Sequence, residues 1–460
     1  MNAVMNWDVI VIGSGQAGVP LATRLAAAGK KVLIVEKGAF GGTCVNVGCT
    51  PTKTMVASAR AAHVARRAAR LGVHAGEVRV DLAAVVDRKD AIVRQWSEGV
   101  RRRLEKAGER LAIRSGHARF VGERTIEVNG ERHVGDAIVV NVGARPDAPP
   151  VRGLADVPWL DSTRIMELRA LPEHLVSLGG GYIACEFGQM FRRFGSRVTI
   201  VHRGKNLLSR EDPDVAGALE AAFRDEGIEL ALGAEAESVA RDGDGIAVTL
   251  RGGGTVRGSH LLVAVGRRPN TDDLGCEAGG IRLDERGSIV ADDHYRTSAR
   301  GVYALGDVIG GPQFTHNSWD DHRILYDLLM GKGDRGRRGR LVPYTVFTDP
   351  QFARVGLSEQ EAKAKGIEHE VATMPFGWVA RAIELDETAG IMKVVLDPKS
   401  ERVLGAAIVG LEAGELIHIF VTLMNAGASA RAIVDAQAVH PTLAEGVQSL
   451  VMRLPRYTLS

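Results

Sequence analysis

The apolar residues of this chain gather in short continuous runs that are bounded by glycines. A run at residues 8–12 is followed by a helical pattern at 19–28 and by a second run at 32–35. The same order returns between residues 175 and 201. Short apolar runs without alternation are typical of strands buried on both faces, as in parallel sheets with helical crossovers. The pattern therefore predicts an α/β fold with two strand–helix–strand units.

The first unit carries a dinucleotide fingerprint. Gly13, Gly15 and Gly18 follow the first strand, and Glu36 ends the second strand. The first glycine permits a tight turn, the second lets the backbone approach a pyrophosphate, and the third lets the helix pack on the strand. The helix N-terminus attracts phosphate, and Glu36 can accept hydrogen bonds from a ribose diol. We therefore expect a nucleotide site here.

The second unit repeats the fingerprint, with a different residue type at its end. Gly179, Gly181 and Ala184 take the three fingerprint positions. No acid ends the following strand, which runs into His202 and Arg203, and basic groups stand there instead: Arg203, Lys205 and, a little later, Arg210. Arginine suits a ribose 2′-phosphate, so the sequence favours NADPH over NADH. That these cations merely solvate the surface remains the alternative.

Two cysteines, Cys44 and Cys49, stand in a glycine-rich stretch with four residues between them. The spacing fits neither the short redox motif nor paired zinc ligands. A loop between glycines can still fold back and bring the two sulfurs within disulfide distance. Pro51 favours a helix start, so Cys49 would lie at the positive end of a helix dipole, which stabilises a thiolate. The pair therefore suits a redox dithiol, although two buried structural cysteines remain open on spacing alone.

Composition narrows the class of protein without deciding it. The 460 residues exceed one ordinary domain, and 58 basic against 56 acidic residues predict no bulk attraction to nucleic acid. No signal-type segment precedes Asp8 and no apolar stretch reaches membrane-spanning length, so we expect neither a signal peptide nor a membrane span. Only four cysteines occur and the candidate disulfide is catalytic in type, so we expect a cytoplasmic location. The basic run at 333–340 is interpreted as a solvated linker.

Taken together, the motifs resemble those of the class I pyridine nucleotide–disulfide oxidoreductases, the group of glutathione reductase, dihydrolipoamide dehydrogenase and mercuric reductase. The resemblance covers essentially the whole chain and is nearest to a mercuric-reductase-like branch. Its segments are 41–53, 264–270, 297–307 and 440–445, besides the two fingerprints. It implies two Rossmann-like domains and a C-terminal α+β dimerisation domain in a homodimer. The expected ranges are 1–148 with 269–338 for FAD, 149–268 for NAD(P)H and 339–460 for the interface.

The resemblance also implies an enzyme and the roles of its residues. Electrons would pass from NADPH through FAD to a Cys44–Cys49 disulfide, with Cys49 at the flavin and Cys44 attacking the substrate. His440 of the partner subunit would act as acid and base, oriented by Glu445. Further residues are implied in catalysis or cofactor binding: Gly42, Thr43, Lys53, His117, Ala118, Gly143, Asp307 and Thr315 for FAD, and Tyr182, Glu186 and Gly266 for the nicotinamide side. Lys53 and Glu186 would form a buried ion pair.

The electron acceptor is not fixed by these motifs. The His440-Pro441 dyad favours a small disulfide, and residues 454–460 lack the cysteine pair that mercuric reductases carry there. The segments 313–323 and 342–350 instead resemble the metal-reducing branch, so reduction of Hg(II) or Cu(II) is the alternative. A dihydrolipoamide dehydrogenase or a non-enzymatic redox sensor is less favoured. No metal cofactor site is expected, and the isolated Cys185 and Cys276 are interpreted as buried small residues.

Two departures from the family pattern accompany these motifs. Thr50 replaces the usual Ile or Val after the second cysteine, where it would tune the Cys49 thiolate or merely pack. Residues 141–143 read Asn-Val-Gly in place of the common small-Thr-Gly.

Overall fold

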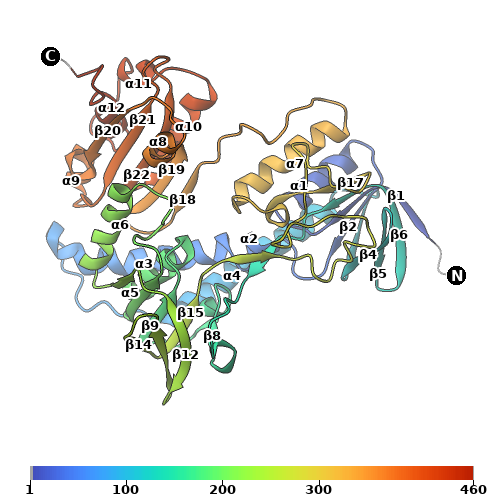
Figure 1. Cartoon of the computed structure of the whole chain (residues 1–460), viewed down its shortest axis with the longest axis horizontal. Coiled ribbons are helices and arrows are strands. Elements are labelled where there is room, and N and C mark those ends of the chain that lie inside the picture. Colours follow the sequence, from blue (N-terminus) through green and yellow to red (C-terminus); the bar gives the residue numbers. More distant parts are fainter. Residues whose placement is uncertain (1–3, 459–460) are drawn as a thin grey trace. The chain divides into compact units, whose positions relative to one another are not determined.

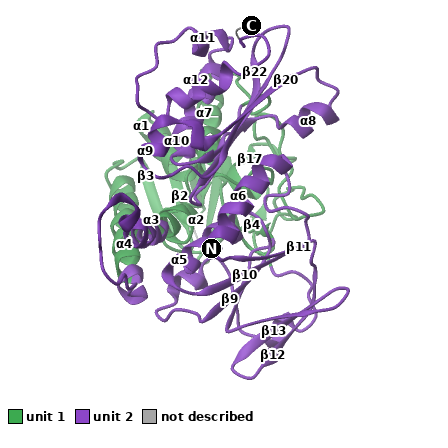
Figure 2. Cartoon of the chain, turned by 90° about the vertical axis from the view of Figure 1, so that its left-hand side faces the viewer, with its two compact units in different colours: residues 1–54, 87–147, 266–340 green, residues 55–86, 148–265, 341–460 purple. Residues whose placement is uncertain are grey.

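A computed structural model describes residues 4–458. The chain forms two compact units, which are coloured separately in Figure 2. Unit 1 comprises residues 1–54, 87–147 and 266–340, and unit 2 comprises 55–86, 148–265 and 341–460. The chain crosses between the units after residues 147, 265 and 340, and the expected domain boundaries lie after residues 148, 268 and 338. The segment 55–86, which the sequence assigned to the FAD domain, belongs to unit 2.

Unit 1 is built on a sheet with the strand order β3-β2-β1-β6-β5-β4, and β17 pairs with β6. The strands are β1 (Met5–Ile12), β2 (Val32–Glu36), β3 (Leu111–Ser115), β4 (Ala118–Gly122), β5 (Thr125–Val128), β6 (Glu131–Val140) and β17 (Val302–Ala304). β1 runs parallel to β2 and β6, in the register Val9↔Val32 and Ile10↔Ile138. The carboxyl ends of these strands therefore meet at one edge, where ligands bind in such sheets.

Helices cover one face of this sheet. Helix α1 (Gly18–Ala27) and helix α7 (Thr315–Leu329) lie side by side in Figure 1. Their residues Leu21, Leu25 and Ile324 share a buried cluster with Val9 and Val11 of β1. Ile10 and Ile12 point to the opposite face, into a second cluster. Both faces of β1 are therefore buried, which explains its continuous apolar run.

Unit 2 holds the second dinucleotide-binding sheet, with the order β11-β10-β9-β15-β8. Its elements are β8 (Trp159–Leu160), β9 (His174–Leu178), α5 (Tyr182–Phe194), β10 (Arg197–His202), α6 (Pro213–Asp225), β11 (Glu229–Leu232) and β15 (His260–Val263). β9 runs parallel to β10 and β15. A separate antiparallel sheet joins β12 (Ala236–Asp242), β13 (Gly245–Leu250) and β14 (Thr255–Gly258). The second strand–helix–strand unit is thus present as predicted.

The C-terminal part of unit 2 is an antiparallel sheet with the order β18-β19-β22-β21-β20. Its strands are β18 (Tyr344–Val346), β19 (Gln351–Gly356), β20 (Glu370–Pro375), β21 (Ile391–Leu396) and β22 (Val403–Gly410), and its longest helix is α10 (Ala413–Asn425). Phe420 of α10 and Ile408 of β22 are fully buried in one apolar cluster. The predicted architecture, two dinucleotide-binding units and an α+β domain, is confirmed.

The basic run at 333–340 is not simply a solvated linker. Arg335 contacts Asp320 at 2.9 Å, and Arg340 contacts Asp321 at 2.6 Å. The backbone N–H of Arg338 donates to Asp293. Acidic residues distant in sequence therefore hold this segment against unit 1, which composition alone does not reveal.

No helix within residues 4–458 is long and apolar enough to cross a membrane.

Candidate active site

Both cysteines of the predicted redox pair lie at helix starts in unit 1. Cys44 belongs to the short helix α2 (Gly42–Asn46), and Cys49 is the first residue of α3 (Cys49–Arg67). The Sγ of Cys49 lies 3.1 Å from Oγ1 of Thr315, the first residue of α7. The other two cysteines, Cys185 and Cys276, are buried, as expected. The predicted loop around Cys44 is thus a five-residue helix instead.

The neighbouring Cys49 raises the pKa of the Cys44 thiol. A hydrogen bond with Cys49 is the main cause that raises the pKa of the Cys44 thiol, and burial adds to it. A hydrogen bond with Thr315 and the charge of Lys53 act in the opposite direction. The Cys44 thiol is therefore harder to ionise than an ordinary thiol, and it needs a base before it can act as a nucleophile.

Glycines place this dithiol against the first fingerprint. Gly41 and Gly42 have φ values of +104° and +63°, which side chains other than glycine rarely adopt. A Cβ at Gly42 would lie 2.9 Å from the Cα of Gly15. The segment that holds Cys44 and Thr43 therefore packs directly on the predicted FAD cradle.

The first fingerprint forms the cradle that its sequence predicts. Gly13 has a φ of +101°, and a Cβ there would lie 2.3 Å from the carbonyl oxygen of Asn141. A Cβ at Gly18 would lie 2.1 Å from the oxygen of Gly13. The Glu36 carboxylate accepts hydrogen bonds from the backbone N–H and hydroxyl of Ser14, at 2.9 and 2.7 Å. Glu36 thus lies beside the turn, at the place where a ribose would be read.

Asn141 is a site residue that motif reasoning did not select. Its Oδ1 accepts from the backbone N–H of Gly18 at 3.0 Å, and its Nδ2 donates to the oxygen of Leu305 at 3.0 Å. The side chain is buried. Asn141 therefore joins the fingerprint helix to the segment that carries Asp307. The only signal in the sequence was a larger polar residue where the family pattern has a small one.

Asp307 offers a direct test of whether this cradle suits FAD. It lies in a short helical turn, Gly306–Ile309, and burial raises the pKa of its carboxyl, against the charge of Arg267. Its side chain is partly exposed. A carboxylate at this place can accept a hydrogen bond from a ligand hydroxyl. The glycine cradle, the helix start and Asp307 together fit the ribityl pyrophosphate of FAD.

The remaining residues predicted for FAD lie in unit 1 at varied positions. The imidazole of His117 lies 3.1 Å from Asp273, and Ala118 is buried in β4. Gly143 has a φ of +67°, and its oxygen accepts from the N–H of Asn270. Gly266, which was predicted for the nicotinamide side, also belongs to unit 1, and its oxygen accepts from the N–H of Asp147. Their contact with a cofactor stays a prediction.

The second fingerprint repeats the steric arrangement of the first. Gly179 has a φ of +115°, and a Cβ there would lie 2.4 Å from the oxygen of Ala264. A Cβ at Gly181 meets nothing within 4 Å, and Ala184 is fully buried. Tyr182, the first residue of α5, is partly exposed. The open backbone before α5 fits a pyrophosphate, as the motif predicts.

Exposed cations follow the second strand of this unit. Arg203, Lys205 and Arg210 are exposed, and none of them forms a salt bridge within the described part of the chain. Cations without carboxylate partners are available to a phosphate group. The preference for NADPH over NADH stays a prediction.

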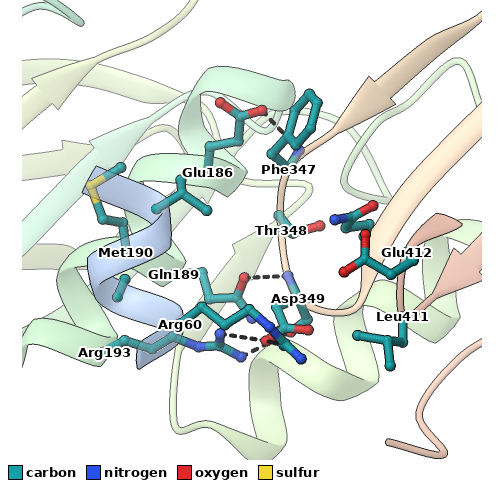
Figure 3. A pocket seen from close by; sticks show the side chains of 13 residues that line it. Arg60, Glu186, Gln189, Met190, Arg193, Phe347, Thr348, Asp349, Leu411 and Glu412 are labelled. Atoms are coloured by element: carbon teal, nitrogen blue, oxygen red, sulfur yellow. Dashed lines mark hydrogen bonds and ion pairs between the residues drawn. The ribbon is translucent and has the colours of Figure 1, made fainter. Parts of the chain in front are cut away.

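Glu186 lies at a cavity of unit 2, shown in Figure 3. It is buried, and its carboxylate accepts from the N–H of Phe347 at 2.9 Å. Arg193 and Asp349 line the same cavity and pair at 2.7 Å. Lys53 belongs to unit 1 and Glu186 to unit 2, so their ion pair stays a prediction.

His440 and Glu445 form a hydrogen-bonded pair in unit 2. Nδ1 of His440 lies 2.9 Å from Oε2 of Glu445, which begins helix α12 (Glu445–Val451). The His440 side chain is 70% exposed, and that of Glu445 is 19% exposed. Because the carboxylate engages Nδ1, the other ring nitrogen, Nε2, is left to exchange a proton with an outside group.

Two family models match the chain. The pyridine nucleotide-disulphide oxidoreductase model covers residues 7–321, and the dimerisation domain of the same family covers 342–451. A mercuric reductase of Bacillus cereus is 36% identical over 451 residues, which span 97% of this chain and 71% of that protein. The probable pyridine nucleotide-disulfide oxidoreductase RclA of Escherichia coli is 35% identical, over 96% of this chain and 98% of its own.

Solved structures agree with these relatives. The Cu(II) complex of the HOCl-induced flavoprotein disulfide reductase RclA from Escherichia coli has a TM-score of 0.89 at 34% identity, covering 97% of this chain and 99% of its own. LpdA from Mycobacterium tuberculosis has a TM-score of 0.89 at 28% identity, over 98% and 99%. With its fingerprints, its cysteine pair and its dimerisation domain, the chain belongs to the pyridine nucleotide-disulphide oxidoreductases, enzymes that use flavin and nicotinamide cofactors.

Proposed function

We propose that this protein is an NADPH-dependent FAD enzyme that reduces a small disulfide through Cys44 and Cys49. The observation that carries the proposal is the His440–Glu445 pair, together with a Cys44 thiol whose pKa is raised, chiefly by its hydrogen bond with Cys49. Thiol–disulfide exchange needs a thiolate and a proton for the leaving sulfur, and a histidine oriented by a carboxylate can serve both steps.

The chemistry that FAD supplies, when bound, is the transfer of an electron pair from the nicotinamide to the Cys44–Cys49 disulfide. Residues of the first fingerprint, Asp307 and Thr315 would hold it, and residues of the second fingerprint would hold NADPH. Lys53 would contribute positive charge near Cys44. A positive charge near the thiols favours the thiolate form.

The reduced dithiol would act in two exchanges. The Cys44 thiolate attacks one sulfur of the substrate R–S–S–R, which forms a mixed disulfide and releases one thiolate. Cys49 then attacks Cys44, which closes the Cys44–Cys49 disulfide and releases the second thiolate. Nε2 of His440 takes the proton from Cys44 and gives it to the first leaving thiolate, and the proton of Cys49 goes to the second. The sum is one dithiol and one disulfide giving one disulfide and two thiols.

We further propose that the enzyme is a cytoplasmic homodimer in which His440 of the partner subunit completes each site. The match to a dimerisation domain over 342–451 supports dimer formation. A two-fold interface allows each subunit to lend the same residue to the other. A dithiol that must be re-reduced at every turnover suits a reducing compartment.

Reduction of Hg(II) or Cu(II) is the second candidate. Cys44 and Cys49 lie within hydrogen-bond reach of each other, and paired thiolates are soft ligands suited to such ions. The relatives named as mercuric reductases and the Cu(II) complex of RclA support it. The metal would be a substrate, and its reduction would need no proton for a leaving thiolate.

An anaerobic reoxidation experiment separates the two candidates. The enzyme is reduced with NADPH and mixed with small disulfides, Hg(II) or Cu(II), and flavin absorbance is followed. We expect fast reoxidation by a disulfide, lost in His440→Ala and kept in His418→Ala, which alters an exposed histidine of α10. Reoxidation by metal ions alone, equal in both variants, would instead establish the metal reductase.

A further inference from the structure

The two nucleotide-binding units differ at one equivalent position. Glu36 is the last residue of β2, and its carboxylate bonds to Ser14, the second residue of the first fingerprint. His202 is the last residue of β10, and its ring lies against Gly180, the second residue of the second fingerprint. A Cβ at Gly180 would lie 2.5 Å from both Cγ and Cδ2 of His202. His202 therefore occupies the place of a ribose-reading acid.

The segment after β10 fixes the ring of His202. Nε2 lies 2.7 Å from the Oγ of Ser209, and that hydroxyl donates its own proton to the oxygen of Asn206 at 3.1 Å. Ser209 must therefore accept from His202, so Nε2 carries a proton whether the ring is neutral or charged. A Cβ at Gly204 would lie 2.5 Å from Nε2, so the ring occupies space that only a glycine at 204 leaves open. Nδ1 is thus the nitrogen that gains or loses a proton.

Among the described residues, Arg203 is the one whose charge shifts the pKa of this ring. Burial lowers the pKa of His202, and the charge of Arg203 lowers it further. Lys205 follows on the same segment, and Gly180 brings no charge. From α6, Glu220 accepts hydrogen bonds from the backbone of Leu207 and the side chain of Asn206. Without a ligand, no carboxylate within the described residues stabilises the charged ring, so a neutral ring is expected near pH 7.

We propose that His202 reads the ribose 2′-phosphate of NADPH by taking up a proton at Nδ1 when the phosphate binds. The proposal rests on the NADPH specificity proposed above. A phosphate group next to the ring supplies the negative charge that the empty site lacks, and the protonated Nδ1 donates a charge-assisted hydrogen bond to it. Preference for NADPH over NADH should therefore grow as the pH falls from about 8 to about 6.5, where imidazole titrates.

Titration calorimetry on the oxidised holoenzyme tests this. The probes are adenosine 2′,5′-bisphosphate, which carries the 2′-phosphate, and 5′-AMP, which lacks it. Measurements in buffers of different ionisation enthalpy give the number of protons taken up per ligand. We expect His202→Asn to take up fewer protons than the wild type with the bisphosphate and to bind it on the order of tenfold more weakly at pH 6.5. Binding of 5′-AMP should be unchanged.

The design separates His202 from other sources of protons. The second ionisation of the 2′-phosphate itself lies near pH 6 and contributes equally in the wild type and the variant, so only the difference reports on His202. His260→Asn alters another half-buried histidine of unit 2, at the start of β15, and should leave proton uptake as in the wild type. Flavin absorbance and the melting temperature check that each variant is folded.

Two results would overturn the inference, and they are distinguishable. Equal proton uptake and equal affinity in His202→Asn and wild type would refute the role of His202 while leaving NADPH specificity intact. Equal binding of the bisphosphate and 5′-AMP by the wild type would refute the NADPH proposal and the inference with it. If His202→Asn does not fold, His202→Glu, which copies Glu36, should reverse the preference between the two probes.

Discussion

Thr315 connects the dithiol to the start of helix α7. Its hydroxyl lies 3.1 Å from Sγ of Cys49 and also lowers the pKa of Cys44, against the larger rise caused by Cys49 and burial. The Thr315 hydroxyl therefore favours the thiolate form of Cys44.

Thr315→Val should therefore make the dithiol less reactive. Without the hydroxyl, the pKa of Cys44 rises further, so its thiolate appears at higher pH. We expect the rate of alkylation of the reduced enzyme by iodoacetamide to fall about tenfold at fixed pH, as one pKa unit would give. Thr125→Val, an isosteric change on β5, is the control. An unchanged rate would show that Thr315 does not tune the pair.

Asn141 has a structural role that can be measured apart from turnover. Asn141→Ala would leave the N–H of Gly18 and the oxygen of Leu305 without partners, at a cost of about 1–3 kcal/mol each. We expect a lower free energy of unfolding and faster loss of FAD in mild denaturant. Asn425→Ala, at an exposed residue of α10, should change neither. Stable retention of FAD in Asn141→Ala would contradict the role assigned to this side chain.

At the scale of elements, an ionic network ties helix α5 to the segment before β19. Arg193 of α5 is buried and pairs with Glu226 and Asp349, both at 2.7 Å. Arg60 of α3 also pairs with Asp349. Burial opposes the charged form of Asp349, but the two arginines outweigh it and hold the pKa of this carboxyl below its ordinary value.

This network predicts a specific acid sensitivity. Because the pKa of Asp349 is depressed in the folded state, its stabilisation is present above the ordinary value of 3.8 and is lost as the pH falls below it. Asp349→Asn should destabilise the protein at pH 7 by about 3–5 kcal/mol, since Arg193 loses a buried partner. Chemical unfolding at pH 7 and pH 3.5 measures both effects. Asp225→Asn, at an exposed residue of α6, should match the wild type at either pH.

The elements also show how far the sequence could predict the structure. β1, α1 and β2 were predicted within a few residues, because their signals are local: apolar runs and glycines whose φ values the turn requires. Helix α2 was missed because it has only five residues, too few to show a helical periodicity, and it begins at Gly42 directly after Gly41. Asn141 could be noted only as a departure from a pattern, since its partners Gly18 and Leu305 lie more than a hundred residues away on either side.

At the scale of the whole molecule, Cys44 and His440 are expected to meet in one active site from two different subunits. Cys44 belongs to unit 1, and His440 to unit 2, within the matched dimerisation domain. If each site combines Cys44 of one subunit with His440 of the other, two inactive variants can complement each other.

Mixing subunits tests this arrangement. Cys44→Ser and His440→Ala homodimers should each be inactive with the disulfide acceptor. After denaturation and refolding together, half of the dimers would be mixed, and each mixed dimer would hold one intact site of two. We expect activity of about a quarter of the wild type, as random pairing in a two-fold dimer gives. Activity no greater than that of the separate variants would place both residues in one subunit.

The two fingerprints also determine which positions tolerate mutation. At Gly13 and Gly179, any side chain would meet a main-chain oxygen at 2.3–2.4 Å, so a library of substitutions should recover only glycine there, with or without selection for cofactor. At Gly181, by contrast, a methyl group meets nothing within 4 Å. Gly181→Ala should express and melt like the wild type, yet bind nicotinamide nucleotides more weakly. A screen scored for folding and again for binding would therefore separate the glycines that the chain needs for itself from those that it keeps clear for a ligand.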